Sequence, residues 1–463
     1  MIILKNLTVE KFNKLYEEGK ITSEKLVEFY LERISKISLN AILEINPDVL
    51  FLARALDKER KNGIKRSNLH GIPIVIKGNI DTYDKMQTTA GAKVLKGNFA
   101  SEDAFLVKKL REAGCIILGK ANLTEFANFV SFKMPNGFSR LGGQTKNPYG
   151  NFDTGGSSSG SAVAIAADFS LLSIGTETSG SILSPASSNS CVGLKPTVGT
   201  VSRTGIIPIS FTQDTAGPIT RTVSDAFELF KVIYGYDPDD PATYVLKNLK
   251  FENKIEELHD YYGMNFGYSE QIMEWLDKEQ LELFLNSLKK VEQLGGKLKK
   301  IEFESLEKLN NIEVLFYEFK LGINNYLKNK NLHIKTLTDI IRYNFKNPDA
   351  IPYGQSILLH SDATDINDNK YIEALLNDKK YAKEELNKIF LKYNLTAFLF
   401  PANYGAHITA KALCPSITVP AGYTNRGPFG ITFSTLEFEE NKLFSLVHLF
   451  EERFPERKLP DID

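Results

Sequence analysis

Two serine-rich segments and one lysine are the parts of this sequence whose residue types and spacing are best suited to chemistry. The segments run over 154–161 and 175–182, and Lys77 ends an apolar run over 72–76. A serine hydroxyl is a poor nucleophile until a neighbouring group takes its proton. A lysine can take it only when neutral, so its pKa must fall from about 10.4 to about 7–8. Because burial disfavours the charged ammonium, a lysine at the end of a buried strand has a suitable environment.

The second serine-rich segment, Gly175-Thr-Glu-Thr-Ser-Gly-Ser-Ile182, offers exposed backbone donors. It follows the strand-like run Leu171-Leu-Ser-Ile174. Backbone N–H groups in such a loop can hold a developing oxyanion or a phosphate. The pattern G-x-x-x-x-G-K-[ST] is not present there, so a phosphate-binding loop is not supported.

The first segment, Thr154-Gly-Gly-Ser-Ser-Ser-Gly-Ser161, has two other interpretations. Its composition fits a flexible linker, but it leads directly into a small-residue run over 162–167 that predicts a close-packed helix. It also matches the G-x-S-x-G nucleophile elbow, with Ser158 as nucleophile. That elbow needs a preceding strand, whereas 147–154 is loop-like, and a downstream histidine, of which there are five. An esterase that uses Ser158 therefore stays open as an alternative.

Apolar periodicity predicts the elements that must position these groups. An apolar strand, a helix and a second apolar strand form the pattern of a parallel α/β unit. The expected helices cover 8–18, 23–36, 101–112 and 273–294, and the expected buried strands cover 71–77, 115–118, 397–400 and 416–419.

The chain is expected to form one domain over 1–463. Its chemical core is predicted over 65–230, and a turn-rich stretch over 236–243 follows it. The Lys/Glu/Asn-rich stretch 245–395 predicts a mostly helical layer. Residues 396–455 regain buried-strand character, so we expect them to return to the core sheet.

Composition excludes several classes of function. The 463 residues carry 56 Lys plus Arg and 57 Asp plus Glu, and this near-neutral balance argues against nucleic-acid or anionic-membrane partners. The sequence has neither a run of 18 apolar residues nor a signal-peptide pattern, so we expect a cytoplasmic protein. Its three widely spaced cysteines predict free thiols rather than disulfides or a zinc site.

Six ordered motifs, with two more near the C-terminus, resemble the amidase signature family, and the resemblance runs from about residue 5 to about residue 452. It implies an α/β fold, an α/β/α sandwich in which helices cover a large mixed sheet. Within the family, the chain is most similar to the peptide amidase branch. The motifs are Gly71-Ile-Pro-Ile-Val-Ile-Lys77, Gly142-Gly-Gln-Thr-Lys-Asn-Pro148, Gly155-Gly-Ser-Ser-Ser-Gly-Ser161, 175–182, Val192-Gly-Leu-Lys-Pro-Thr197, Gln213-Asp-Thr-Ala-Gly-Pro218, Pro420-Ala-Gly422 and Gly430-Ile-Thr-Phe433.

The resemblance also implies the site residues, a Ser–cis-Ser–Lys triad. It assigns the nucleophile to Ser181, the cis-serine to Ser157 and the base to Lys77, which spacing alone does not separate from Lys120 and Lys195. The predicted oxyanion hole is built from backbone N–H groups of Thr178, Ser179 and Gly180. This chemistry needs no metal and no cofactor.

The resulting prediction is an amide hydrolase that works through an acyl-enzyme. The peptide amidase resemblance implies a small-molecule or short peptide amide as substrate, such as a C-terminal peptide amide, with an acid and ammonia or an amine as products. With this interpretation, we expect the helical layer over 245–395 to lie on the substrate side, and the enzyme to be a monomer or homodimer. The alternatives are the glutaminase component of a tRNA-dependent amidotransferase, which needs a partner subunit, and a catalytically silent binding protein, against which the intact Lys77, Ser157 and Ser181 argue.

Overall fold

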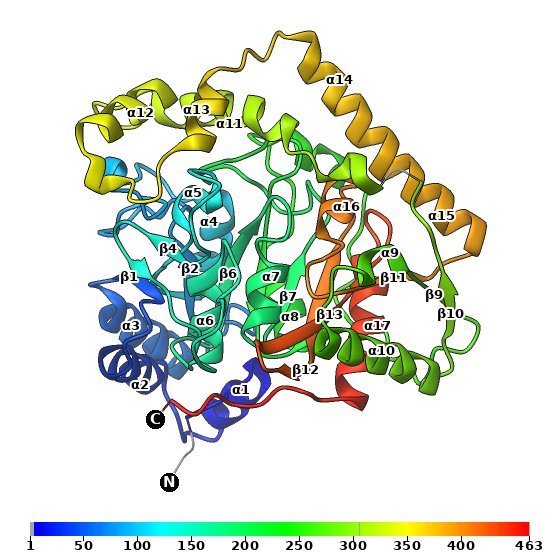
Figure 1. Cartoon of the computed structure of the whole chain (residues 1–463). Helices are drawn as coiled ribbons and strands as arrows, with labels where there is room; N and C mark the ends of the chain where they lie inside the picture. Colours follow the sequence, from blue (N-terminus) through cyan, green and yellow to red (C-terminus); the bar gives the residue numbers. More distant parts are fainter. Residues whose placement is uncertain (1–3, 305, 463) are drawn as a thin grey trace.

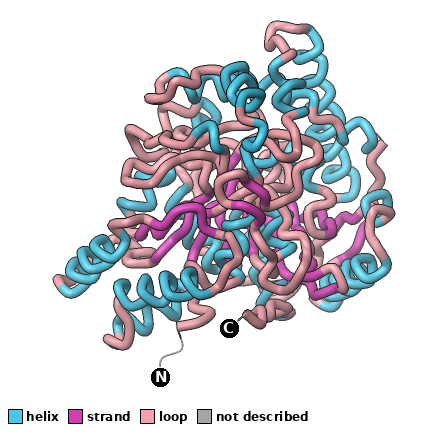
Figure 2. The backbone as a smooth tube through the Cα atoms, turned by 60° about the vertical axis from the view of Figure 1, so that its left-hand side comes forward, coloured by secondary structure: helices cyan, strands magenta, loops and turns pink. Residues whose placement is uncertain are grey.

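A computed structural model describes residues 4–304 and 306–462. Its centre is an 11-stranded sheet in the order β1-β3-β2-β6-β8-β7-β12-β13-β11-β9-β10, and β4 and β5 form a separate pair. Figure 2 shows the strands running through the middle of the molecule with helices around them. The strands are β1 (Ile42–Ile45), β2 (Pro73–Lys77), β3 (Ile116–Ala121), β4 (Phe138–Ser139), β5 (Gly143–Gln144), β6 (Leu172–Glu177), β7 (Val192–Lys195), β8 (Thr215–Thr220), β9 (Asn265–Tyr268), β10 (Lys297–Lys300), β11 (Ala397–Pro401), β12 (Ser416–Thr424) and β13 (Gly427–Ser434).

The large sheet is mixed in direction and covered on both faces. β2 runs parallel to both β3 and β6, whereas β8, β7, β12 and β13 pair antiparallel in the middle of the sheet. Every residue of β2, β3 and β6 is buried, which requires packing on both faces of these strands. The predicted α/β fold with a large mixed sheet is confirmed.

Helices make up most of the remaining ordered structure, and the first two begin at threonine caps. Thr8 and Thr22 accept backbone N–H groups of the first turns of α1 and α2, both at 3.2 Å. The helices are α1 (Val9–Glu17), α2 (Ser23–Lys36), α3 (Val49–Lys61), α4 (Phe105–Glu112), α5 (Glu125–Asn128), α6 (Ser159–Ala166), α7 (Leu183–Ser188), α8 (Val223–Ile233), α9 (Glu270–Met273), α10 (Lys278–Gln293), α11 (Glu313–Lys328), α12 (Leu337–Lys346), α13 (Ser356–Asp362), α14 (Asn369–Asp378), α15 (Glu385–Tyr393), α16 (Ala406–Lys411) and α17 (Glu440–Arg453).

Two predicted helices were too long. The helix expected over 101–112 begins only at Phe105, and the one expected over 273–294 is interrupted before Lys278. Asp277 causes the interruption, because it forms a capping box with Gln280 and so starts a new helix. Apolar spacing continues through Trp275 and Leu276 and therefore did not reveal the second break, whereas residues 101–103 carry no apolar side chain that could have fixed the start of the first helix.

The stretch 245–395 contributes both to the helical layer and to the sheet. Its helices α11, α12 and α13 pack together at the top of Figure 1, and α14 and α15 lie along the upper right of the same view. The stretch also supplies β9 and β10, which extend the sheet in parallel beyond β11. These two short strands were not predicted from the sequence.

Lys77 and Glu177 end two neighbouring parallel strands, β2 and β6, which pair through Ile76 and Ile174. In parallel sheets, the carboxyl ends of the strands and the loops that follow them are the usual place for a site. Among the described residues, none of the helices is both long and apolar enough to span a membrane.

Candidate active site

Lys77 is fully buried and lies at the centre of a cluster of hydroxyl groups. Its Nζ is 2.8 Å from Ser157 Oγ and 2.8 Å from Ser158 Oγ. It also lies 2.9 Å from the Thr176 hydroxyl and 3.1 Å from the Thr176 carbonyl. The structure therefore brings the predicted lysine and the predicted cis-serine into direct contact.

Burial lowers the pKa of Lys77 to about 7, because the ammonium loses its hydration. The negative charges of Asp214 and Glu177 oppose that shift and favour the charged form. Near neutral pH, a substantial fraction of Lys77 is therefore a neutral amine that can accept a proton.

Lys120 and Lys195 are also buried, so burial alone does not distinguish the three lysines. Burial lowers the pKa of Lys120 to about 8 and lowers that of Lys195 as well. Their partners differ from those of Lys77, however. Lys120 contacts the Ile80 carbonyl and the Thr88 hydroxyl, whereas Lys195 contacts the Pro196 carbonyl. The contact with two serine hydroxyls sets Lys77 apart from these two lysines.

Ser157 and Ser158 lie just before α6, in the loop that follows Thr154. The peptide bond between Gly156 and Ser157 is cis. Both hydroxyls reach Lys77, but Ser158 has further partners: its hydroxyl donates to the Thr176 carbonyl at 3.0 Å and accepts the Thr176 N–H at 3.2 Å. The proton of Ser158 is therefore already engaged in the cluster.

The loop after β6 carries the other predicted residues. Glu177 accepts the backbone N–H groups of Ile182 and Leu183 at 2.6 and 3.0 Å, so it braces the loop from inside. Gly180 adopts a positive φ of 92°, and Ser181 is half-buried. The carbonyl of Ser181 accepts the N–H of Ser158 at 3.1 Å, which places this loop against the Lys77 cluster.

The predicted site residues thus lie in one region of the molecule. Lys77 and Ser157 are in contact, and Ser181 adjoins them through its main chain. The transfer of a proton from the Ser181 hydroxyl to Ser157 stays a prediction, as does the use of the backbone donors of 178–180.

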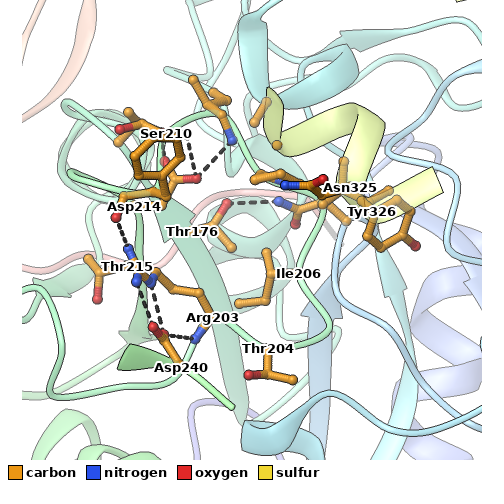
Figure 3. Close-up of a pocket in the computed structure, with 18 of the residues that line it drawn as sticks. Thr176, Arg203, Thr204, Ile206, Ser210, Asp214, Thr215, Asp240, Asn325 and Tyr326 are labelled. Carbon is orange, nitrogen blue, oxygen red and sulfur yellow. Dashed lines mark hydrogen bonds and ion pairs between the residues drawn. The ribbon is translucent and has the colours of Figure 1, made fainter. Parts of the chain in front are cut away.

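A cavity of about 530 Å³ opens beside this loop (Figure 3). Thr176 and Thr178 connect it to the serine loops, and α11 contributes part of its wall. Apolar side chains supply much of the lining, with a smaller set of polar and charged groups among them. The apolar residues include Ile206, Ile207, Pro208, Ile209, Phe211 and Leu321, and the polar ones include Asn79, Arg203, Asp214, Asp240, Asn325 and Tyr326.

Asp214 and Thr176 were not singled out from the sequence. Asp214 accepts the Thr178 hydroxyl at 2.5 Å, and burial raises its pKa to about 6. The motif Gln213-Asp-Thr-Ala-Gly-Pro218 contains Asp214 and was the sequence signal that could have pointed to it. The position of Asp214 beside the loop, however, depends on how β8 pairs with β6.

The structure argues against a nucleophile elbow at Ser158. Such an elbow needs a strand directly before the serine. Residues 145–158 contain no strand, and the preceding one, β5, ends at Gln144. The esterase alternative therefore lacks the required geometry.

Comparison with known proteins agrees with this geometry. Residues 25–412 match the family model described as Amidase. The chain is 39% identical to a probable amidase of Arabidopsis thaliana, over 99% of this chain and 92% of that protein. A crystal structure of an amidase family protein from Bacillus anthracis has a TM-score of 0.94 at 39% identity, and the match covers 99% of this chain and 93% of that one.

Two further structures bear on the branch of the family. The native peptide amidase from Stenotrophomonas maltophilia has a TM-score of 0.92 at 35% identity, covering 99% of both chains. The A-type component of the glutamyl-tRNA(Gln) amidotransferase from Thermotoga maritima has a TM-score of 0.75 at 26% identity, covering 100% of this chain and 99% of that one. With its sheet, its lysine–serine cluster and these matches, the chain belongs to the amidase signature family and is an amidase-family hydrolase.

Proposed function

We propose that this enzyme hydrolyses a linear amide C–N bond through an acyl-enzyme on Ser181, with Ser157 as proton relay and Lys77 as base. The observation that carries the proposal is the buried Lys77 amine, 2.8 Å from Ser157 Oγ, whose pKa burial lowers to about 7. A neutral amine in contact with a hydroxyl can draw a proton through that hydroxyl.

The relay role falls to Ser157 rather than Ser158. The Ser158 hydroxyl already donates to the Thr176 carbonyl, so its proton is engaged elsewhere. Ser157 can give its proton to the lone pair of Lys77 and take one from Ser181. It reaches Lys77 at the same distance as Ser158.

The cycle begins when Ser181 attacks the amide carbonyl while its proton passes through Ser157 to Lys77. Backbone N–H groups of Thr178, Ser179 and Gly180 hold the tetrahedral oxyanion. The proton then returns through Ser157 to the leaving nitrogen, and the C–N bond breaks. Water, activated by the same relay, releases the acyl group as a carboxylic acid and restores Ser181.

A C-terminal peptide amide, or a similar small amide, is the proposed substrate, and internal peptide bonds are not. The similarity to peptide amidase structures supports this class. The cavity beside Thr178 supports it as well, because its volume of about 530 Å³ and apolar walls suit an amino-acid side chain and its neighbour. The products are an acid and ammonia or an amine.

The alternative is the glutaminase component of a tRNA-dependent amidotransferase. The lower TM-score to that component, 0.75 against 0.92, favours the peptide amidase branch. We propose that the enzyme acts in the cytoplasm as a monomer or homodimer without a partner subunit. Co-purification of a second type of chain, with glutamine as the preferred amide, would contradict this.

An ammonia-release screen tests the proposal. The panel contains amidated peptides, free glutamine, and simple aliphatic and aryl amides, and we expect turnover of amidated peptides. A fluorophosphonate should label Ser181, identified by peptide mapping. Ser181→Ala should abolish both turnover and labelling, whereas Ser158→Ala should retain both. Label on any other residue would overturn the assignment of the nucleophile.

A further inference from the structure

Asp214 holds the first residue of the predicted oxyanion loop, and the chemistry proposed above gives it no role. Its Oδ1 accepts the Thr178 hydroxyl at 2.5 Å. Its Oδ2 accepts the backbone N–H groups of Ile209 and Ser210, each at 2.8 Å. Three donors on one carboxylate leave it a single orientation, and hydrogen bonds to an ionised acceptor are the stronger kind. Figure 3 shows Asp214 beside Ser210 in the wall of the cavity.

The segment that carries Asp214 is itself well held. Asp214 directly precedes β8, whose first residue, Thr215, pairs with Glu177 at the end of β6. On the other side, the buried Glu318 of α11 accepts the Ser210 hydroxyl and both the N–H and the hydroxyl of Thr212. Asp214 is therefore fixed to the sheet on one side and to the helical layer on the other.

Two carboxylates, those of Glu177 and Asp214, hold the oxyanion loop at its two ends. Glu177 holds the far end of the loop through the N–H groups of Ile182 and Leu183. Asp214 holds the near end through Thr178. Between them lies Gly180, whose positive φ and missing side chain leave this part of the loop free to turn unless its ends are fixed.

We infer that Asp214 is a positioning residue, which fixes Thr178 so that the backbone donors of 178–180 point at the place where the oxyanion forms. The inference rests on the proposed function. Donors aimed in advance at a developing charge are worth most, and losing one costs about 10²–10³-fold in kcat. Loosening the residue that carries a donor should cost a smaller factor.

The charged groups around Asp214 give a signature that a purely structural residue lacks. Arg203 faces it but is paired with Asp240 at 2.6 Å, and Glu318 lies beyond Ser210. The charge of Asp214 also raises the pKa of Lys77, as the charge of Glu177 does. Removing the charge of Asp214 should therefore move the acid limb of the pH profile to lower pH while kcat falls.

The test compares Asp214→Asn, Thr178→Val and Thr178→Ser on an amide that the wild type hydrolyses, with thermal unfolding measured in parallel. We expect Asp214→Asn and Thr178→Val each to lower kcat about tenfold or more, whereas Thr178→Ser keeps the hydroxyl and stays within about threefold. Because the two residues act through one contact, the double variant Asp214→Asn/Thr178→Val should lose little more than the worse single variant.

Asp225→Asn is the matched control, since it removes another carboxylate whose pKa burial raises to about 6. Asp225 accepts the Val9 N–H at 2.9 Å and joins α8 to α1, so its loss should lower stability and spare kcat. Any of three outcomes would overturn this inference and leave the proposed function standing. These are an unchanged kcat in Asp214→Asn, a double variant whose loss of kcat is the full sum of the two single losses, and equal losses of kcat in Thr178→Ser and Thr178→Val. A wild type that hydrolyses no amide in the panel would overturn the proposed function and this inference with it.

Discussion

Lys77 sets the pH dependence of the proposed chemistry, because only its neutral form can take a proton. Its pKa is lowered to about 7 by burial, so kcat/KM should fall about tenfold for each pH unit below about 7. Lys77→Met should lower kcat by about 10²–10⁴-fold at neutral pH, the usual contribution of a general base. A pH series of initial rates on an amidated peptide measures both effects.

Lys120→Met is the matched control for this prediction. Lys120 is equally buried, and its pKa is also lowered by burial, but its partners are the Ile80 carbonyl and the Thr88 hydroxyl. Its loss should change stability and leave the acid limb in place. If the Lys120 variant moved the acid limb and the Lys77 variant did not, the base would have been misassigned.

At the scale of elements, the site depends on how the loop before α6 packs against the start of α7. Gly155 has a φ of 62°, and a Cβ on it would lie 2.7 Å from the backbone of Ser184 and Pro185. Gly155→Ala should therefore push the Ser157 loop away from the Ser181 loop. We expect kcat to fall at least about tenfold together with a lower Tm, since small misplacements of catalytic groups are costly.

Gly19→Ala separates backbone strain from this packing effect. Gly19 has a similar φ of 67° with nothing within 4 Å of its position for a Cβ. Alanine there should cost about 1 kcal/mol of stability and leave kcat unchanged. Equal losses of kcat in Gly155→Ala and Gly19→Ala would show that the close packing of Gly155 against Ser184 and Pro185 is not what the activity requires.

For the whole molecule, the buried amine makes stability depend on pH. The pKa of Lys77 falls from 10.5 to about 7 on folding, so between these values the unfolded chain binds more protons than the folded one. Stability therefore rises with pH across that window, by up to about 1.4 kcal/mol per pH unit from this group. Below about pH 7 the amine is charged in both states, and the full loss of stability from burying that charge remains.

Urea unfolding of the wild type and Lys77→Met at about pH 7 and about pH 9 measures this effect. The variant lacks the titrating amine, so its stability relative to the wild type should be greatest at the lower pH and shrink at the higher one. A difference that stays constant with pH would mean that Lys77 keeps its ordinary pKa in the folded protein.

Much of the architecture was readable from the sequence. Local sequence patterns predicted α1, α2 and the buried strands β2 and β6, because helical periodicity and continuous apolar runs are properties of a few neighbouring residues. The break before Lys278 was not readable from apolar spacing, since this spacing continues through Trp275 and Leu276, and the start at Phe105 was not readable because residues 101–103 are all polar. The short strands β9 and β10 were missed because they are defined by parallel pairing with β11 at the edge of the sheet.

By itself, the sequence determined the family, through motifs that are local in the chain, and the residue types that the chemistry needs. The motif resemblance already named Lys77 as the base, but only the tertiary structure showed that its amine contacts two serine hydroxyls, and that Asp214 lies against Thr178. The physical reason is that desolvation and contact are properties of neighbours in space. Lys77 and Ser157 are 80 positions apart, and no local pattern in the chain specifies that they touch.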